Sequence, residues 1–365
     1  RSPKLTGGQA VKAVVLRKPK DLVLTDIPCP KLTEAYHALI RVEACGICGS
    51  DLRYWAGENP WSLHTLGRHL DNPPNMVMGH EFAGVVTQVN SSRFENLLGK
   101  RVGVQAFRSC GACNLCQSGH ENLCKDTVHI GHAQGWGLME FYPGAYAEYC
   151  IGFADLLHPI PDHVAAEEAA MRDILGVAVH AAGRAHIGPD ATILCIGGGP
   201  AGLSIAQVAR NRGAHHIFIS DPSPVARRVI AQFPDFVCIN PKTEPVHDAI
   251  DAGTCSAVFD TVGTAETLSE SLSLLAETGT YVNLAVHDTQ LTLNSTVLGS
   301  ERIITTSSNA LYRDEQEAHN LISSGAVNMR SMITHRFPLD EFQEAFDLLL
   351  RDPKEAYKVV FEIGQ

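Results

Sequence analysis

The sequence lacks the features that would direct it to a membrane or to nucleic acid. It contains no run of about 18 uncharged apolar residues, so no transmembrane helix is expected. No apolar run follows the first residues, Arg1 to Lys4, so we expect no secretory signal and a cytoplasmic location. Basic residues are outnumbered, because 29 Lys and Arg against 40 Asp and Glu give a formal net charge of −11. An acidic chain is not attracted to nucleic acid or to anionic lipid, and neither is expected as a partner.

The chain also lacks internal repeats and low-complexity linkers, although its 365 residues are enough for about two domains. Residues 1–157 are β-rich in pattern, with short apolar runs between Gly and Pro and with loops that carry most of the Cys and His. Residues 158–312 alternate apolar strand-like runs with amphipathic runs of helix length, which is typical of a parallel α/β sheet. Residues 313–365 contain two helix-like segments and a final apolar strand. We expect these parts to pack tightly around a cleft.

Cysteine is plentiful, with 11 residues in the chain. The count is odd and four of the residues are close together, which argues against a disulfide framework. The spacing Cys110-x2-Cys113-x2-Cys116-x7-Cys124 brings four thiolates within reach of one ion. Tetrahedral Zn²⁺ is the expected occupant of this four-cysteine lobe, and four protein ligands make such a site structural. An iron–sulfur cluster also uses four thiolates and is the alternative.

A glycine-rich segment, residues 197–202, fits the pattern G-x-G-x-x-G between a predicted strand and a predicted helix. Glycines there allow a tight turn and close approach to a pyrophosphate, and the helix N-terminus favours phosphate. The next predicted strand ends at Asp221, whose carboxylate can accept hydrogen bonds from a ribose and repels a 2′-phosphate, which favours NAD over NADP. The expected cofactor-binding residues are Gly197, Gly199, Pro200, Ala201, Gly202, Asp221 and Arg227. The alternatives are a turn that merely caps a helix, and a solvated helix face for Arg227 and Arg228.

A second possible metal site combines two segments, Cys48-Gly49-Ser50-Asp51 and Gly79-His80-Glu81. Each alone is weak evidence, because a lone Cys usually lies in a core and a lone His is usually satisfied by a hydrogen bond. Together Cys48, His80 and Glu81 offer a thiolate, an imidazole and a carboxylate. A third protein ligand would complete a site with one open position for water or substrate, as catalytic zinc requires.

These motifs, with Gly144-Ala145-Tyr146-Ala147-Glu148-Tyr149, stand in the order found in zinc-dependent medium-chain alcohol dehydrogenases, which the chain resembles over about residues 11–363. The segment from Glu167 to Asp173, followed by His180, resembles the polyol branch of sorbitol, threonine and butanediol dehydrogenases. The resemblance implies an α/β fold, in which a Rossmann doubly wound parallel sheet at 158–312 binds NAD. It places a β-rich GroES-like catalytic domain with the four-cysteine lobe at 1–157, to which residues 313–365 return. It also implies a homodimer or homotetramer.

The resemblance assigns the metal ligands as well. Cys48 and His80 match ligands of the catalytic zinc, and Glu81 matches a carboxylate beside the metal that ligates in some members. Asp173 matches the position of the third ligand. The alternatives for Asp173 are a carboxylate that binds through water or one that lies outside the coordination sphere.

Three further residues receive roles from the resemblance. Ser50 matches the hydroxyl that passes a proton from the alcohol toward the nicotinamide ribose, Asp51 matches a carboxylate that orients the ligand histidine, and Tyr54 matches an aromatic residue of the substrate pocket.

The sequence departs from the family pattern in two places. Arg53 stands where many relatives have a relay histidine, and Arg is a poor proton acceptor, so the proton would leave through the ribose, His64 or His69. The segment between Ser50 and Gly79 is longer than in the family. It either borders the substrate cleft and influences specificity or forms a surface loop.

The expected function is that of an oxidoreductase, a zinc-dependent alcohol dehydrogenase. It interconverts a secondary alcohol or polyol and its ketone or aldehyde by hydride transfer to or from NAD. Two alternatives stay open. One is a zinc-free reductase of the same fold that acts on an enone or quinone, against which Cys48, His80 and the acidic third position argue. The other is a non-catalytic NAD-binding protein, against which the intact ligands and Ser50 argue.

Overall fold

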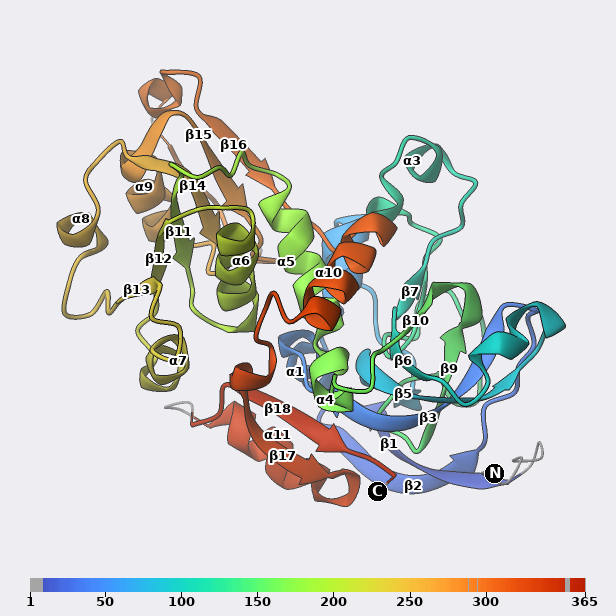
Figure 1. The fold of residues 1–365 in the computed structure, drawn as a ribbon. Coiled ribbons are helices and arrows are strands. Elements are labelled where there is room, and N and C mark those ends of the chain that lie inside the picture. The colour runs from blue at the N-terminus through green and yellow to red at the C-terminus, as the bar shows by residue number, and fades with distance from the viewer. Residues whose placement is uncertain (1–8, 288, 294, 352–354, 365) are drawn as a thin grey trace.

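The computed structural model describes residues 9–287, 289–293, 295–351 and 355–364. The segment Arg1 to Lys4, on which the expectation about a secretory signal depends, lies outside the described residues. No helix within these residues combines the length and the hydrophobicity needed to cross a bilayer. Figure 1 shows two sheet-based parts side by side, and the first and last strands of the chain, in blue and red, lie in the same part.

The β-rich part is built on a seven-stranded mixed sheet of order β10-β6-β5-β3-β18-β17, in which β9 also pairs with β3. Strand β18 pairs with β3 in antiparallel fashion and with β17 in parallel, so the end of the chain completes a sheet begun near its start. The strands are β3 (His37–Gly46), β5 (Glu81–Val89), β6 (Arg101–Val104), β9 (Tyr149–Phe153), β10 (Leu157–Pro159), β17 (Ile333–Pro338) and β18 (Lys358–Glu362). Smaller sheets join β2 (Asp21–Pro28), β1 (Ala10–Lys18) and β4 (Met76–Val77), and β7 (Phe107–Arg108) with β8 (Val128–His129).

The second part contains a six-stranded parallel sheet of order β13-β12-β11-β14-β15-β16. Its strands are β11 (Thr192–Ile196), β12 (His216–Ser220), β13 (Phe236–Ile239), β14 (Cys255–Asp260), β15 (Leu275–Asn283) and β16 (Ile303–Thr306). Strand order reverses beside the first strand, as in doubly wound nucleotide-binding sheets. In the central strand β11, the four residues from Ile193 to Ile196 are apolar and buried, which suits a sheet covered on both faces. The predicted fold class, a doubly wound parallel sheet with a β-rich part, is confirmed.

Helices α5 (Arg172–Ala182), α6 (Pro200–Asn211) and α10 (Tyr312–Ser324) pack together between the two sheets (Figure 1). Helix α6 packs on β11 and β12, and α10 packs on α5. The remaining helices are α1 (Gly49–Ala56), α2 (Pro60–Leu66), α3 (Asn114–Gln117), α4 (Ala166–Ala170), α7 (Pro224–Ile230), α8 (Val246–Ala249), α9 (Ala265–Leu274) and α11 (Phe342–Leu350). Short 3₁₀ turns occupy Ser92–Leu97, Glu121–Leu123, Ala154–Leu156, Ser295–Leu298, Arg330–Met332 and Leu339–Glu341.

The turn between β11 and α6 depends on its glycines. Gly197 has φ +87°, in the left-handed region, and a Cβ there would overlap Oγ1 of Thr261. A Cβ on Gly202 would overlap the carbonyl oxygen of Gly197, so the first turn of the helix can pack closely on the loop only without a side chain. Helix α6 then begins at Pro200, a residue suited to the first helical position because it has no N–H to leave unbonded.

Candidate active site and metal centres

The four-cysteine lobe brings its sulfur atoms together. Sγ of Cys113 lies 3.5 Å from Sγ of Cys116 and 4.0 Å from that of Cys124, and Sγ of Cys110 lies 3.9 Å from that of Cys116. Tetrahedral zinc with Zn–S bonds of about 2.3 Å separates its sulfurs by about 3.8 Å, so the lobe fits one tetrahedral ion. All four cysteines are free of disulfides, which agrees with a metal-binding role.

A second group of possible ligands forms where two elements begin. Cys48 immediately precedes α1, and His80 immediately precedes β5, whose first residue is Glu81. The possible ligand atoms of Cys48, His80 and Glu81 lie within 4.8 Å of one another. Residues 32 positions apart in the sequence thus form one cluster of a thiolate, an imidazole and a carboxylate, the donor set that zinc prefers.

Glu81 has a second partner that the sequence analysis missed. Its Oε2 pairs with Nζ of Lys358, which also donates to the carbonyl oxygen of Ile47 at 3.0 Å. Both side chains are almost completely buried. The other carboxylate oxygen, Oε1 of Glu81, is buried without a hydrogen-bond partner among the described residues, so it is the atom of Glu81 available to a metal.

Asp173 lies in the first turn of α5 and lines the same cavity as Cys48 and His80. It is not part of the compact group formed by Cys48, His80 and Glu81. Burial raises the pKa of the Asp173 carboxyl, and the neighbouring His80 acts against this rise. A cation bound in the cavity would favour the ionised carboxylate in the same way.

The carboxylate of Asp51 contacts the Nδ1 side of the His80 imidazole. Its Oδ1 lies 3.5 Å from Nδ1 of His80, while its Oδ2 accepts hydrogen bonds from the Cys48 N–H at 2.9 Å and the Tyr146 hydroxyl at 2.8 Å. Burial alone would raise the pKa of Asp51, but His80 and these donors hold it below its usual value. An ionised carboxylate against Nδ1 leaves Nε2 of His80 as the nitrogen that can bind a metal.

These residues open into a cavity of about 270 Å³ that lies between the two sheet-based parts. Ser50 lines it, and the Ser50 hydroxyl is buried with no partner in the described part of the chain. Leu284 and Val286, which follow strand β15, form another part of the wall, so the cavity reaches the carboxyl ends of the parallel strands, where such sheets bind nucleotides.

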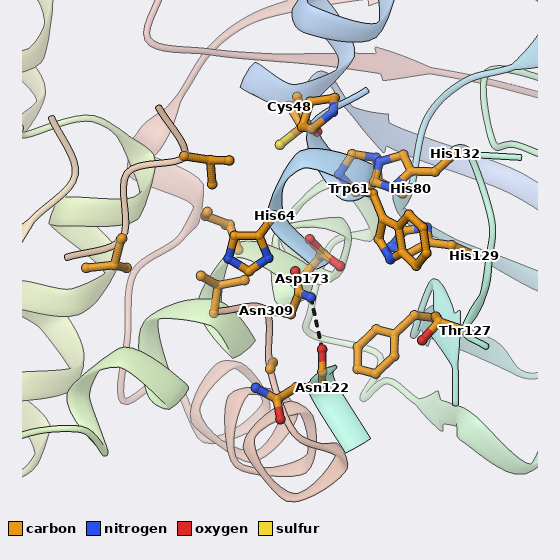
Figure 2. Close-up of a pocket in the computed structure, with 18 of the residues that line it drawn as sticks. Cys48, Trp61, His64, His80, Asn122, Thr127, His129, His132, Asp173 and Asn309 are labelled. Carbon is orange, nitrogen blue, oxygen red and sulfur yellow. Dashed lines mark hydrogen bonds between the residues drawn. The ribbon is translucent and has the colours of Figure 1, made fainter. Parts of the chain in front are cut away.

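Two histidines in this wall were not anticipated from the sequence. His129 and His132 line the cavity, and their rings stack with centroids 3.9 Å apart. The His132 ring lies 4.4 Å from that of His80. Figure 2 shows the three imidazoles gathered on one side of the cavity. The spacing His129-x2-His132, after the fourth cysteine of the lobe, was the available sequence signal.

The long segment after Ser50 folds in part as helix α2. Asn59 caps it by accepting a hydrogen bond from the Ser62 N–H at 2.9 Å, and the helix places Pro60 in the cavity wall. Trp61 and His64 of the same helix also line the cavity (Figure 2). This portion borders the cavity, as one of the two expectations had it. His69 is exposed and lies outside the cavity wall.

Tyr54 does not line the cavity, although it was expected in the substrate pocket, and Arg53 makes contacts across the cavity edge. Tyr54 is completely buried outside the cavity lining, with its ring 4.6 Å from that of His132, so it supports the wall rather than forming it. Arg53 donates to Glu58 at 2.7 Å and to the carbonyl oxygen of Val286 at 3.0 Å. It therefore links the two parts of the molecule at the cavity edge.

The glycine-rich loop and Asp221 also lie together. The Gly198 N–H donates to Oδ2 of Asp221 at 2.7 Å, and the Ser223 N–H donates to Oδ1 at 2.6 Å. The Arg227 guanidinium donates to the carbonyl oxygens of Asp221 and Pro222. The carboxylate is thus fixed beside the loop, while Arg227 faces backbone rather than the space in front of Asp221.

Known proteins resemble the chain along nearly its whole length. Residues 34–162 match the family model for the alcohol dehydrogenase GroES-like domain, and residues 235–360 match that for zinc-binding dehydrogenase. Sorbitol dehydrogenase of Bacillus subtilis is 26% identical, with 96% of this chain and 97% of the relative covered. D-Arabitol-phosphate dehydrogenase of Enterococcus avium is 29% identical, with 90% and 91% covered.

The solved structure of a zinc-binding dehydrogenase of Sinorhizobium meliloti bound to NADP superposes with a TM-score of 0.85 at 26% identity, covering 97% of this chain and 99% of the relative. The fold, the two family matches and these relatives agree. The chain belongs to the zinc-binding medium-chain alcohol dehydrogenases, is similar to their polyol-type members, and is an oxidoreductase that interconverts an alcohol and its carbonyl compound.

Proposed function

We propose that this protein is a zinc- and NAD-dependent dehydrogenase of a secondary alcohol or polyol. The observation that carries the proposal is the joining of Cys48, His80 and the buried Ser50 hydroxyl in one cavity that also reaches the parallel sheet. Cys48, His80 and Asp173, with Glu81 beside them, would hold a catalytic zinc ion, and the four-cysteine lobe would hold a structural one. When bound, zinc supplies Lewis-acid activation of the substrate oxygen, and NAD supplies the hydride acceptor.

The chain's own residues then have distinct tasks. Asp51 keeps His80 in one orientation through Nδ1. Ser50, whose hydroxyl has no competing partner among the described residues, accepts the alcohol proton and passes it on. Of the two histidines predicted to receive that proton, His64 lines the cavity and is the one proposed here, whereas His69 lies outside the cavity wall. The buried apolar part of the wall excludes water from the reacting carbon.

NAD is favoured over NADP by Asp221. Its negative charge stands beside the glycine-rich loop, and Arg227, a candidate partner for a 2′-phosphate, is hydrogen-bonded to backbone oxygens. The Sinorhizobium relative, by contrast, was solved bound to NADP.

Ser50→Ala tests the catalytic assignment. Loss of the hydroxyl should lower kcat with the alcohol by about 10²- to 10⁴-fold, the usual contribution of a positioned proton acceptor, while NADH binding measured by fluorescence is retained. Ser50→Thr, which keeps a hydroxyl, is the matched control. Unchanged turnover in Ser50→Ala would remove Ser50 from proton transfer, and turnover of enones without zinc would favour the zinc-free reductase instead.

A homo-oligomer is also part of the proposal. Strand β16 lies at the edge of the parallel sheet, and its side chains Ile303 and Ile304 are 52% and 38% exposed. An unpaired edge with apolar side chains favours pairing with a second copy of the chain. Sedimentation of wild type and of Ile303→Lys tests this, because the variant should shift toward the monomer. A cytoplasmic location stays a prediction from the sequence.

A further inference from the structure

His132 lines the cavity, and both of its ring nitrogens lack hydrogen-bond partners among the described residues. Its side chain belongs to a residue only 8% exposed, and neither Nδ1 nor Nε2 has a hydrogen-bond partner in the described part of the chain. Burying a polar group without a partner is costly, so such a group in a binding cavity points to a ligand that supplies the partner.

The orientation of the His132 ring is fixed by three neighbours. Tyr54 packs at 4.6 Å on one side, His129 stacks at 3.9 Å with an interplanar angle of 14°, and His80 lies at 4.4 Å edge-on. Four aromatic rings in contact leave little freedom for the imidazole to turn. The His132 nitrogens are therefore preorganised next to the metal ligand His80.

His129 adds a hydrogen-bond acceptor to the same wall. Its Nδ1 lies 2.7 Å from the carbonyl oxygen of Ile130, a contact that requires Nδ1 to carry the proton. Nε2 of His129 is then an unprotonated nitrogen. The His129 ring packs between the rings of His132 and Phe107, a setting that favours the neutral imidazole.

The charge of the wall limits what these imidazoles can bind. No Lys or Arg occurs among the described residues that line the cavity, whereas Asp173 and Glu315 do. The other polar groups of the wall are uncharged, including Asn122, Thr127 and Asn309 (Figure 2). A phosphate or carboxylate on the substrate would find no Lys or Arg partner in this wall, and its oxygens could only accept hydrogen bonds.

We propose that His129 and His132 form a subsite that binds a hydroxyl on the carbon next to the reacting carbinol, so that the enzyme selects uncharged vicinal diols and polyols. A hydroxyl both donates and accepts, which matches one protonated and one unprotonated imidazole nitrogen. The short distance from His132 to His80 places this second oxygen beside the one held at the metal ligands. The assignment rests on the proposed dehydrogenase function. Both histidines act as substrate-positioning residues.

The experiment compares butane-2,3-diol with butan-2-ol, which has the same carbon chain and one hydroxyl fewer, as substrates for NAD⁺ reduction. Wild type should prefer the diol in kcat/KM by at least about tenfold, the effect of one buried hydrogen bond. His132→Leu should reduce this preference by about 10- to 100-fold, with the larger change in KM, and His132→Gln should restore part of it. His129→Leu should act in the same direction.

His319→Leu is the matched control. His319 pairs with His158 at 5.1 Å and lies outside the cavity lining, so removing it should leave the diol-to-alcohol ratio unchanged. A second readout is equilibrium binding to the enzyme–NADH complex, in which 3-hydroxybutan-2-one should bind wild type at least about tenfold more tightly than butan-2-one.

Three results would overturn the subsite. One is an equal preference for diol and alcohol in wild type, another an equal loss of both activities in His132→Leu, and the third a loss of zinc from His132→Gln, which would make His132 a metal ligand. A preference for glycerol 3-phosphate over glycerol would overturn the exclusion of anionic substrates. If no alcohol is turned over, the proposed dehydrogenase function fails, and the binding comparison alone decides the subsite.

Discussion

The carboxylate of Asp51 lies 3.5 Å from Nδ1 of His80, with the Asp51 side chain completely buried. Because the Cys48 N–H and the Tyr146 hydroxyl bind its other oxygen, Asp51 connects both expected zinc ligands to the core. Asp51→Asn should lower zinc affinity or turnover by about 10- to 100-fold, since an amide cannot hold the imidazole by charge. Tyr146→Phe keeps the carboxylate and should have a smaller effect. If Asp51→Asn keeps the metal content and turnover of the wild type, the contact between Asp51 and His80 is not needed.

The third zinc ligand can be decided by metal analysis. Oε2 of Glu81 is engaged by Lys358, whereas Asp173 lines the cavity and has no ion-pair partner among the described residues. We therefore expect Asp173→Asn to lose one zinc ion per chain and its turnover. Glu81→Gln should keep the ion while its turnover falls. The reverse pattern would identify Glu81 as the ligand and assign Asp173 to the cavity wall alone.

The four-cysteine lobe should influence the cavity through Asn122. This residue lies just before Cys124, lines the cavity, and donates to the carbonyl oxygen of Ser308 at 2.8 Å, while Asn309 donates to the backbone of Asn122 at 3.1 Å (Figure 2). Cys113→Ser should release the lobe zinc and reduce turnover, yet NADH binding should persist because it depends on the parallel sheet. Asn122→Ala, which keeps the lobe intact, should raise KM for the alcohol. Full activity of Cys113→Ser would show that lobe and cavity are independent.

Cofactor preference should follow the charge of Asp221. Asp221→Asn keeps one of the two acceptor oxygens that receive the Gly198 and Ser223 N–H groups, so one of these hydrogen bonds is lost, and it removes the repulsion of a 2′-phosphate. The ratio of kcat/KM for NADP⁺ to that for NAD⁺ should rise by about tenfold or more. An unchanged ratio would mean that cofactor choice is made elsewhere in the adenosine site.

The docking of the chain end should depend on pH through Glu167. Its carboxylate, in α4, accepts two hydrogen bonds from Arg336 in β17, at 2.6 and 3.0 Å, and these hold the pKa of Glu167 below its usual value. The stabilisation is present above the unfolded pKa and is lost as the pH falls through the folded one. Glu167→Gln should therefore lower the free energy of unfolding by about 1 kcal/mol at pH 7, and the difference should shrink below pH of about 4. Glu362→Gln, at 3.8 Å from Arg336, should cost less. Equal stability of the two variants would contradict this.

Much of the fold and part of the site could be predicted from sequence because their signals are local. Cys110 to Cys124 is one short motif, and the glycine-rich loop stands beside a continuously apolar strand. The clustering of Cys48 with His80 depends on the pairing of β3 with β5, which spacing alone does not fix. The donor types of the two segments suggested the cluster, and the resemblance to a known family assigned the ligand roles.

The roles of the residues that the sequence analysis missed depend on contacts between segments far apart in the chain. Lys358 begins an apolar strand, and a single Lys in such a strand was a readable sign of a buried ion pair, but its partner Glu81 is far away in sequence. His129 and His132 showed no periodicity and follow the lobe in a loop-rich region. Tyr54 was expected in the substrate pocket, and the structure places it one layer behind, against His132. The motif therefore predicted that Tyr54 lies near the site, but it did not predict which side chains line the cavity and which pack behind them.

The most direct test of the account measures zinc content and NAD⁺ reduction in the same preparations of wild type and Cys48→Ser. A panel of diols, polyols, secondary alcohols and primary alcohols serves as substrate at mildly alkaline pH. The account predicts that wild type turns over an alcohol with NAD⁺ and that Cys48→Ser contains one zinc ion fewer per chain, keeps the lobe zinc and is inactive. Equal zinc content in the two proteins, or full turnover by Cys48→Ser, would contradict it.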